Sequence, residues 1–159
     1  MIDSDKIPQD ITSHCHIKID KEGKWYYDGK EMIHRKIYLF FNQLLKKDED
    51  GKYFIEDNTQ RCYLEVEDTP FVIVNLEFSA APSIILLLND ETKETLLPGT
   101  LRIAKDNVVY CQVKGGKYEA RFSRKSYYKL ARYIDFDQEK EEFFLIIGSN
   151  KYYLPPPAS

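Results

Sequence analysis

The sequence predicts an α+β fold made of two small, β-rich halves that are related by duplication. Two segments space their apolar residues as amphipathic helices do, and much of the remaining chain alternates apolar and polar residues as β-strands do. The order hairpin, helix, strand occurs once in each half. The chain has 159 residues, 43% of them hydrophobic and 31% charged, so it can bury a core beneath a solvated surface.

The first half begins with a predicted β-hairpin. Residues 14–19 alternate, Lys21-Glu22-Gly23 forms the turn, and residues 24–27 return along the first strand. The spacing then changes to i, i+3, i+4, i+7, i+8, which predicts an amphipathic helix. The apolar face of this helix consists of Ile37, Phe40, Phe41, Leu44 and Leu45. Three predicted strands follow, at residues 52–56, 61–67 and 71–78.

The second half contains the most apolar run of the chain, residues 83–88, which predicts a buried strand. A strand at 100–104 and a hairpin at 108–122 follow, with Gly115-Gly116 at the hairpin tip. Ser123 is a suitable N-cap for a second helix that runs to about residue 135. The core face of that helix consists of Tyr127, Leu130, Ala131 and Ile134. Residues 143–147 and 152–154 are predicted closing strands before the prolines at 155–157.

The duplication rests on similar hairpin tips and similar helices. Residues 21–25 are similar to residues 114–118, and each segment precedes a helix. Tyr38, Phe41 and Leu45 align without a gap on Tyr127, Leu130 and Ile134. Chance similarity between two amphipathic segments is the alternative. The predicted organisation is an N-terminal tail at 1–9, an N-terminal half at 10–79, a C-terminal half at 80–155 and a tail at 156–159.

Charge and cysteine content exclude several classes of protein. A net charge of −3 and a pI near 5.7 give no general attraction to nucleic acid, so a nucleic-acid partner is disfavoured. Cys15, Cys62 and Cys111 are odd in number and far apart, which predicts reduced thiols in a cytoplasmic protein and no disulfide. The acidic N-terminus does not resemble a signal peptide, and no apolar run approaches the roughly 20 residues of a membrane span.

Several segments resemble a known bacterial family. Residues 65–72, Glu-Val-Glu-Asp-Thr-Pro-Phe-Val, are similar to a V-E-D-A-P-F-V motif. The other similar segments are residues 17–25, 35–40, 48–51, 101–103 and 118–122. By these residues the chain resembles the family catalogued as domain of unknown function 1285, from about Asp10 to Pro155. The resemblance implies a duplicated α+β fold, a C-terminal half loosely like a pleckstrin-homology domain, and a role as a binding partner in signalling.

The resemblance also implies a candidate site in a groove between the halves, although the chain departs from the family pattern in two places. The family often has Thr-Asn before its Gly-Asp turn and His before its P-L-R segment. This chain has Leu88-Asn89-Asp90 and Pro98-Gly99-Thr100 there. A ligand contact made by the missing Thr or His is therefore not expected.

Charged residues inside apolar strands identify the candidate groove residues. An arginine in such a strand usually has a carboxylate partner or binds an anionic ligand, and Arg102 and Arg121 are in this position. Asp68 enters the corner at Pro70, where an Asx-turn is the structural alternative. Trp25 is a core residue or a ligand platform. The full candidate set is Trp25, Arg35, Glu67, Asp68, Arg102, Glu119 and Arg121.

Three functions compete on these residues. The leading hypothesis is a non-enzymatic module that binds a protein, a peptide or a small molecule. The second is an enzyme that uses Glu67 or Asp68 as general base beside Arg102 or Arg121. The third is a nucleic-acid or phospholipid module that uses the basic face of the second helix. That face carries Arg124, Lys125, Lys129 and Arg132, with Tyr128 and Tyr133 between them.

No catalytic residue, metal site or cofactor is assigned. His14 and His16 share one face of a strand while Cys15 lies on the other, so at most two metal-type ligands converge. All three histidines lie within the first 34 residues, and no nucleophile elbow is present. The sequence specifies neither the partner nor the oligomeric state.

Overall fold

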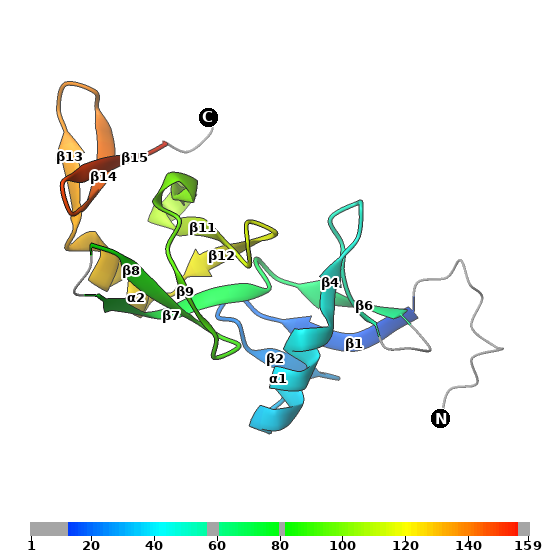
Figure 1. The fold of residues 1–159 in the computed structure, drawn as a ribbon. Helices are drawn as coiled ribbons and strands as arrows, with labels where there is room; N and C mark the ends of the chain where they lie inside the picture. Colours follow the sequence, from blue (N-terminus) through cyan, green and yellow to red (C-terminus); the bar gives the residue numbers. More distant parts are fainter. Residues whose placement is uncertain (1–12, 57–60, 80–81, 156–159) are drawn as a thin grey trace. The chain divides into compact units, whose positions relative to one another are not determined.

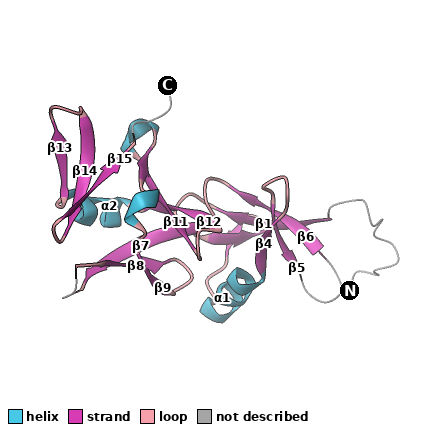
Figure 2. Cartoon of the chain, turned by 45° about the horizontal axis from the view of Figure 1, so that its top comes forward, coloured by secondary structure: helices cyan, strands magenta, loops and turns pink. Residues whose placement is uncertain are grey.

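The computed structural model describes residues 13–56, 61–79 and 82–155. The chain forms two compact units, Met1–Asp68 and Thr69–Ser159. The boundary between the units lies before the strand at Phe71–Phe78. The predicted halves, 10–79 and 80–155, would place it after that strand. The reason is pairing, because both strands that pair with it in the described part of the chain belong to the second unit. Strands predominate over helices in both units (Figure 2).

The first unit contains one helix and one sheet, sheet A (Figure 1). Its elements are β1 (Ser13–Ile19), β2 (Trp25–Tyr27), β3 (Lys30–Glu31), α1 (Arg35–Leu44), β4 (Leu45–Lys47), β5 (Tyr53–Glu56) and β6 (Arg61–Val66). The strand order is β3-β2-β1-β6-β5-β4. Sheet A therefore consists of two antiparallel three-stranded segments, joined at the centre by the parallel pair β1 and β6.

The second unit contains sheet B, with the strand order β10-β11-β12-β7-β8-β9. Its elements are β7 (Phe71–Phe78), β8 (Ile84–Leu88), β9 (Lys93–Thr95), the 3-10 turn η2 (Pro98–Thr100), β10 (Arg102–Ile103), the 3-10 turn η3 (Lys105–Asn107), β11 (Val109–Val113) and β12 (Tyr118–Phe122). Its centre is again a parallel pair, formed by the first strand β7 and the last strand β12. Sheets A and B thus have the same pairing order.

The second unit continues with α2 (Arg124–Ala131) and a small antiparallel sheet, sheet C. Sheet C consists of β13 (Ile134–Asp137), β14 (Glu142–Ile147) and β15 (Asn150–Leu154) (Figure 1). Ser123 caps α2 as predicted, because its side chain accepts a hydrogen bond from the Ser126 N–H. The predicted helix to residue 135 is too long, since Ile134 begins β13.

The α+β class and the order hairpin, helix, strand are present in both halves, but the two helices are not equivalent. The strand after α1, β4, belongs to the same sheet as the hairpin before it, whereas the strand after α2, β13, belongs to another sheet. The repeat in pairing order relates β1–β6 to β7–β12 instead. In that alignment α1 corresponds to the short connection that contains η2.

The residues predicted to form the apolar faces of the two helices are not equally buried. Leu130 of α2 is fully buried, but Ile37 of α1 is 47% exposed and Phe40 is 55% exposed. The only buried residue of α1 is Asn42, and Leu45 is buried in β4 rather than on the helix. Helical spacing identifies residues on one face, and the structure leaves much of that face of α1 open to solvent.

The prediction of three reduced cysteines is wrong for two of them. Cys15 of β1 and Cys62 of β6 form a disulfide across the central parallel pair of sheet A, with Cα atoms 5.3 Å apart. The parallel pairing brings together two residues that are 47 positions apart. Cys111 of β11 is free and buried. Among the described residues, no helix is long and apolar enough to cross a membrane.

Candidate functional site

The predicted site residues are distributed over the two units. Trp25, Arg35, Glu67 and Asp68 belong to the first unit, and Arg102, Glu119 and Arg121 belong to the second. A shared groove for all seven stays a prediction. Trp25 is only 2% exposed and its ring stacks on Phe41 with centroids 6.2 Å apart, so it is a core residue and not a ligand platform.

The predicted carboxylates and arginines are mostly engaged within their own units. Glu67 Oε2 accepts a hydrogen bond from the Lys21 N–H at 2.8 Å, which ties the end of β6 to the β1–β2 turn. Arg102 donates two hydrogen bonds of 2.6 Å to Glu119, and its guanidinium lies 4.3 Å from the Tyr110 ring centroid. This bidentate pair is the structural alternative that the sequence left open.

The corner at Thr69 is organised by backbone contacts. Thr69 Oγ1 donates to the Phe71 carbonyl at 2.7 Å and accepts from the Arg121 N–H at 3.2 Å. Arg121 therefore contributes its backbone to this corner of the second unit. Arg35 is exposed at the first position of α1, and Asp68 is partly buried at the end of the first unit.

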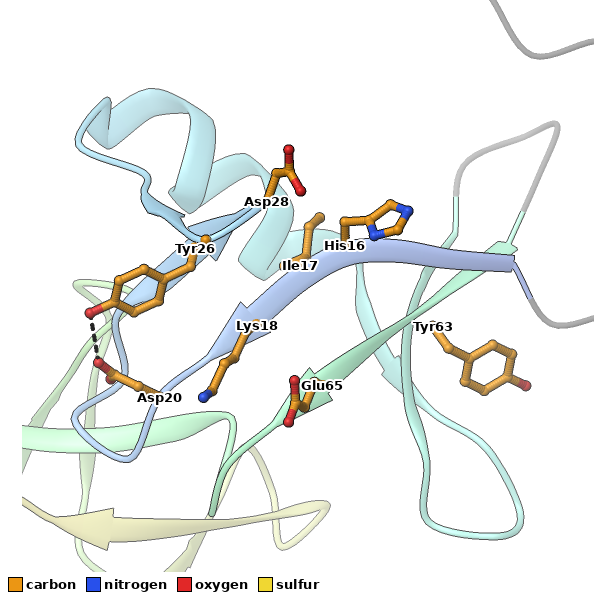
Figure 3. A pocket seen from close by; sticks show the side chains of 9 residues that line it. His16, Ile17, Lys18, Asp20, Tyr26, Asp28, Tyr63 and Glu65 are labelled. Atoms are coloured by element: carbon orange, nitrogen blue, oxygen red, sulfur yellow. Dashed lines mark hydrogen bonds between the residues drawn. The ribbon is translucent and has the colours of Figure 1, made fainter.

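A pocket of about 700 Å³ opens on sheet A in the first unit (Figure 3). We call it the β1–β6 pocket. Its lining residues come from β1, from β2 and the turn after it, and from β6. They are His16, Ile17, Lys18, Asp20, Tyr26, Asp28, Gly29, Tyr63 and Glu65.

Strand alternation explains why polar groups line this pocket. Ile17 and Ile19 are buried on one face of β1, so Lys18 between them faces the opposite side. The register places Lys18 opposite Tyr26 of β2 and opposite Glu65 of β6. Three polar side chains from neighbouring strands are therefore aligned across the pocket.

The backbone at one end of the pocket is irregular. The β1–β6 register shifts between His14 and Lys18, and His16 has a φ of 59°. Asp28 and Gly29 also have positive φ, and the Asp28 N–H donates to the His16 carbonyl at 2.8 Å. Left-handed backbone costs a non-glycine residue about 1–2 kcal/mol. The cost is largest for side chains that cannot form a local hydrogen bond. Such strain concentrates at functional sites.

Hydrogen bonds fix the opposite end of the pocket. Asp20 Oδ1 accepts from the Glu22 and Lys24 N–H groups, each at 2.9 Å, and Asp20 Oδ2 accepts from the Tyr26 hydroxyl at 3.0 Å (Figure 3). The bond to Asp20 raises the pKa of Tyr26, because the phenol must give up that bond to ionise. This wall is preorganised, and the carboxylate of Asp20 accepts three hydrogen bonds that hold it in place.

Four side chains of the pocket form no hydrogen bond or ion pair with the described part of the chain. They are His16, Lys18, Asp28 and Glu65, and all four are exposed. Polar groups that converge on one cavity and lack internal partners are typical of a binding site. Across the described ranges, no group of three or more His, Cys, Asp or Glu residues could hold a metal ion, and Cys15 is committed to its disulfide.

Most of this pocket could not be predicted from the sequence. Alternation shows that Lys18 and Glu65 lie on the polar faces of their strands, but it does not show that the two strands are parallel neighbours. The Asp28-Gly29 turn was the available signal, because both residue types favour positive φ. The segment 17–25, which carries part of the family resemblance, contains the residues that build one wall.

Comparison with known proteins adds a family match that covers the pocket. Residues 6–69 match the model described as "Domain of unknown function (DUF1285), N-terminal domain". This range includes every residue that lines the β1–β6 pocket. No curated protein matches the chain.

Two solved structures share the fold. One is a DUF1285 family protein from Silicibacter pomeroyi DSS-3, 20% identical, with a TM-score of 0.72 over 95% of this chain and 91% of that chain. The other is a DUF1285 family protein from Shewanella baltica OS155, 22% identical, with a TM-score of 0.62 over 73% of this chain and 90% of that chain.

Proposed function

We propose that this chain, whose residues 6–69 belong to the family of DUF1285 N-terminal domains, is a non-enzymatic binding module with its ligand site in the β1–β6 pocket. One observation carries the proposal. Four polar side chains without partners among the described residues surround a cavity of about 700 Å³ beside a left-handed stretch of backbone. Cavities of this size with a few convergent polar groups accommodate small ligands or single side chains of a partner.

The contacts favour binding over catalysis at the residues first considered. An enzyme based on Glu67 with Arg102 needs a carboxylate and a guanidinium that are open to substrate. Glu67 instead holds the Lys21 backbone, and Arg102 is closed by Glu119. Groups already used inside the fold must break those bonds before they can act on a substrate.

The basic face of α2 supports a nucleic-acid or phospholipid role less well. Lys129 donates to Asn75 Oδ1 at 2.7 Å, so one of the four basic residues ties the helix to sheet B. Tyr128 remains 62% exposed and Arg124 is exposed. With a net charge of −3 for the chain, the long-range attraction to phosphates is small.

Three finer expectations belong to this proposal: a pleckstrin-homology-like C-terminal half, a role in signalling, and a cytoplasmic location. The location now carries a condition. Disulfides are rare in reducing compartments, so a cytoplasmic protein must keep the Cys15–Cys62 bond shielded or use it reversibly. Measuring the redox state of these two cysteines in freshly lysed, alkylated cells tests that condition.

The proposal is tested by NMR titration of the full chain with a library of amines, carboxylates, phosphates and short peptides. At least one class is expected to shift the amide signals of His16, Lys18 and Glu65 more than those of the second unit. Lys18→Trp fills the pocket and is expected to abolish these shifts. Lys46→Trp is the matched control, an exposed lysine of β4 outside the pocket. Absence of any localised shift across the library refutes the proposal.

A further inference from the structure

Resting on the proposed function, we infer that the β1–β6 pocket selects an organic cation, a ligand with primary ammonium groups on an aliphatic chain. The charge of the lining points in this direction. The lining contains one lysine, Lys18, and three carboxylates, Asp20, Asp28 and Glu65, which gives a formal net charge of −2 with histidine counted as neutral. A concave surface of one sign concentrates ligands of the opposite sign.

The spatial arrangement leaves two of these carboxylates for the ligand. Asp20 is used by two backbone N–H groups and by Tyr26, and Lys18 lies between Asp20 and Glu65 in Figure 3. Asp28 projects from the β2–β3 turn at one end of the pocket, and Glu65 projects from β6. The two available acceptors therefore come from different elements, and a ligand that uses both must span the cavity.

This spread disfavours a metal ion. Magnesium and calcium need several oxygen ligands within about 2.0–2.6 Å of one point. No three metal-ligating residue types gather in this way within residues 13–56, 61–79 and 82–155. An extended organic cation can instead place one charged group near Asp28 and another near Glu65.

The two tyrosines offer a ligand their rings rather than their hydroxyl protons. The Tyr26 hydroxyl donates to Asp20, and the Tyr63 hydroxyl donates to Asp48 Oδ2 at 3.0 Å. Both hydroxyl protons are thus committed inside the fold, so Lys18 and His16 are the side-chain donors that remain in the lining. The aromatic rings remain as apolar surface for methylene groups and as cation–π partners for ammonium groups.

Isothermal titration calorimetry of the full chain with spermidine tests the inference, and citrate is the anionic comparison. Spermidine is expected to bind and citrate is not. Glu65→Gln and Asp28→Asn are each expected to weaken spermidine binding about fivefold. Asn tolerates positive φ, so the second variant keeps the turn at position 28. Glu141→Gln removes one exposed carboxylate from the second unit and is expected to change nothing.

A second arm identifies the source of the ammonium group. Spermidine that binds more tightly than a lysine-containing peptide supports a free polyamine, and the reverse order supports a lysine side chain of a partner. Equal weakening by Glu141→Gln means non-specific charge attraction and overturns the inference. If carboxylates or phosphates shift the pocket signals and neither amine binds, the ammonium inference fails while the proposed function stands. If no compound class shifts them, both fail.

Discussion

Sheets A and B have the same pairing order and are stabilised differently. In sheet B the strands are rich in fully buried residues, and α2 is fastened to β7 by a buried hydrogen bond of 2.7 Å from Ser126 Oγ to the Ile73 carbonyl. In the first unit, which contains sheet A, Asn42 is the only buried residue of α1, and its Oδ1 has no partner within the described residues. A disulfide crosses the central parallel pair of sheet A instead.

The comparison shows that the same strand order can be stabilised mainly by side-chain packing in one unit and by packing together with a disulfide in the other. Small units bury a smaller fraction of their surface and are more often stabilised by cross-links. The disulfide of sheet A also joins the neighbours of His16 and Tyr63, two residues that line the β1–β6 pocket. The same link therefore supports the proposed site.

The largest expected effect comes from removing this link. Replacing Cys15 and Cys62 together by Ala opens a loop of 47 residues, and the chain-entropy relation gives a loss of about 4 kcal/mol in the free energy of unfolding. Urea unfolding followed by Trp25 fluorescence measures it, because the only tryptophan lies in the first unit. Hydrogen exchange of β11 amides is the control for the second unit. Unchanged fluorescence midpoints would contradict the comparison.

Local features of these two units were predictable, and distant pairings were not. Ser123 as N-cap and the strand at Phe71–Phe78 follow from side-chain chemistry and alternation over a few residues. The Cys15–Cys62 bond depends on β1 and β6 being parallel neighbours, and alternation within a strand does not identify its partner. The prediction of reduced thiols failed for that reason.

The site shows the same limit. The Arg102–Glu119 pair was among the alternatives because an arginine in an apolar strand needs a carboxylate, and a local hairpin supplies one. The pocket was missed because Lys18 and Glu65 meet only through the distant β1–β6 pairing. Periodicity likewise placed Ile37 on an apolar face without showing that the face is exposed.

The next largest effect contrasts the two helices directly. Leu130→Ala in α2 removes a fully buried side chain and is expected to cost about 3 kcal/mol. Ile37→Ala in α1 removes a side chain that is 47% exposed, and the expected change is within about 0.5 kcal/mol. Chemical denaturation of both variants, with a probe in each unit, measures the difference. Similar losses for the two variants would mean that α1 packs more tightly than its exposure indicates.

A smaller effect is expected from the ion pair of sheet B. Arg102 and Glu119 form two short hydrogen bonds, but their side chains are 43% and 38% exposed. Solvent screening limits such a pair to about 0.5–1 kcal/mol. A double-mutant cycle of Arg102→Gln and Glu119→Gln measures the coupling energy, and Lys93 with Glu77 is a more exposed pair for comparison. A coupling energy of several kcal/mol would show that sheet B relies on charge as well as packing.

The smallest effect concerns a device that both units share. Asp48 in the first unit and Asp137 in the second each accept two backbone N–H bonds in a hairpin turn and a third bond from a tyrosine hydroxyl. These bonds favour the ionised carboxylate and lower both pKa values below the ordinary 3.8, chiefly through the Lys52 N–H for Asp48 and the Tyr153 hydroxyl for Asp137.

A carboxyl group whose pKa is lowered by folding stabilises the fold above its ordinary pKa. That stabilisation is lost as the pH falls from about 4 through the lower folded pKa. Asp48→Asn keeps an acceptor for the turn and removes the titration, so the melting temperature of the first unit is expected to fall less steeply below about pH 4. Asp50→Asn removes the same charge from the same turn and is the control.

Because Asp137 makes the matching contacts in the second unit, Asp137→Asn is expected to make the melting temperature of that unit fall less steeply below about pH 4. The Trp25 signal of the first unit is expected to stay unchanged. A single variant that reduces the acid-induced fall of melting temperature in both units would show that the two units unfold as one.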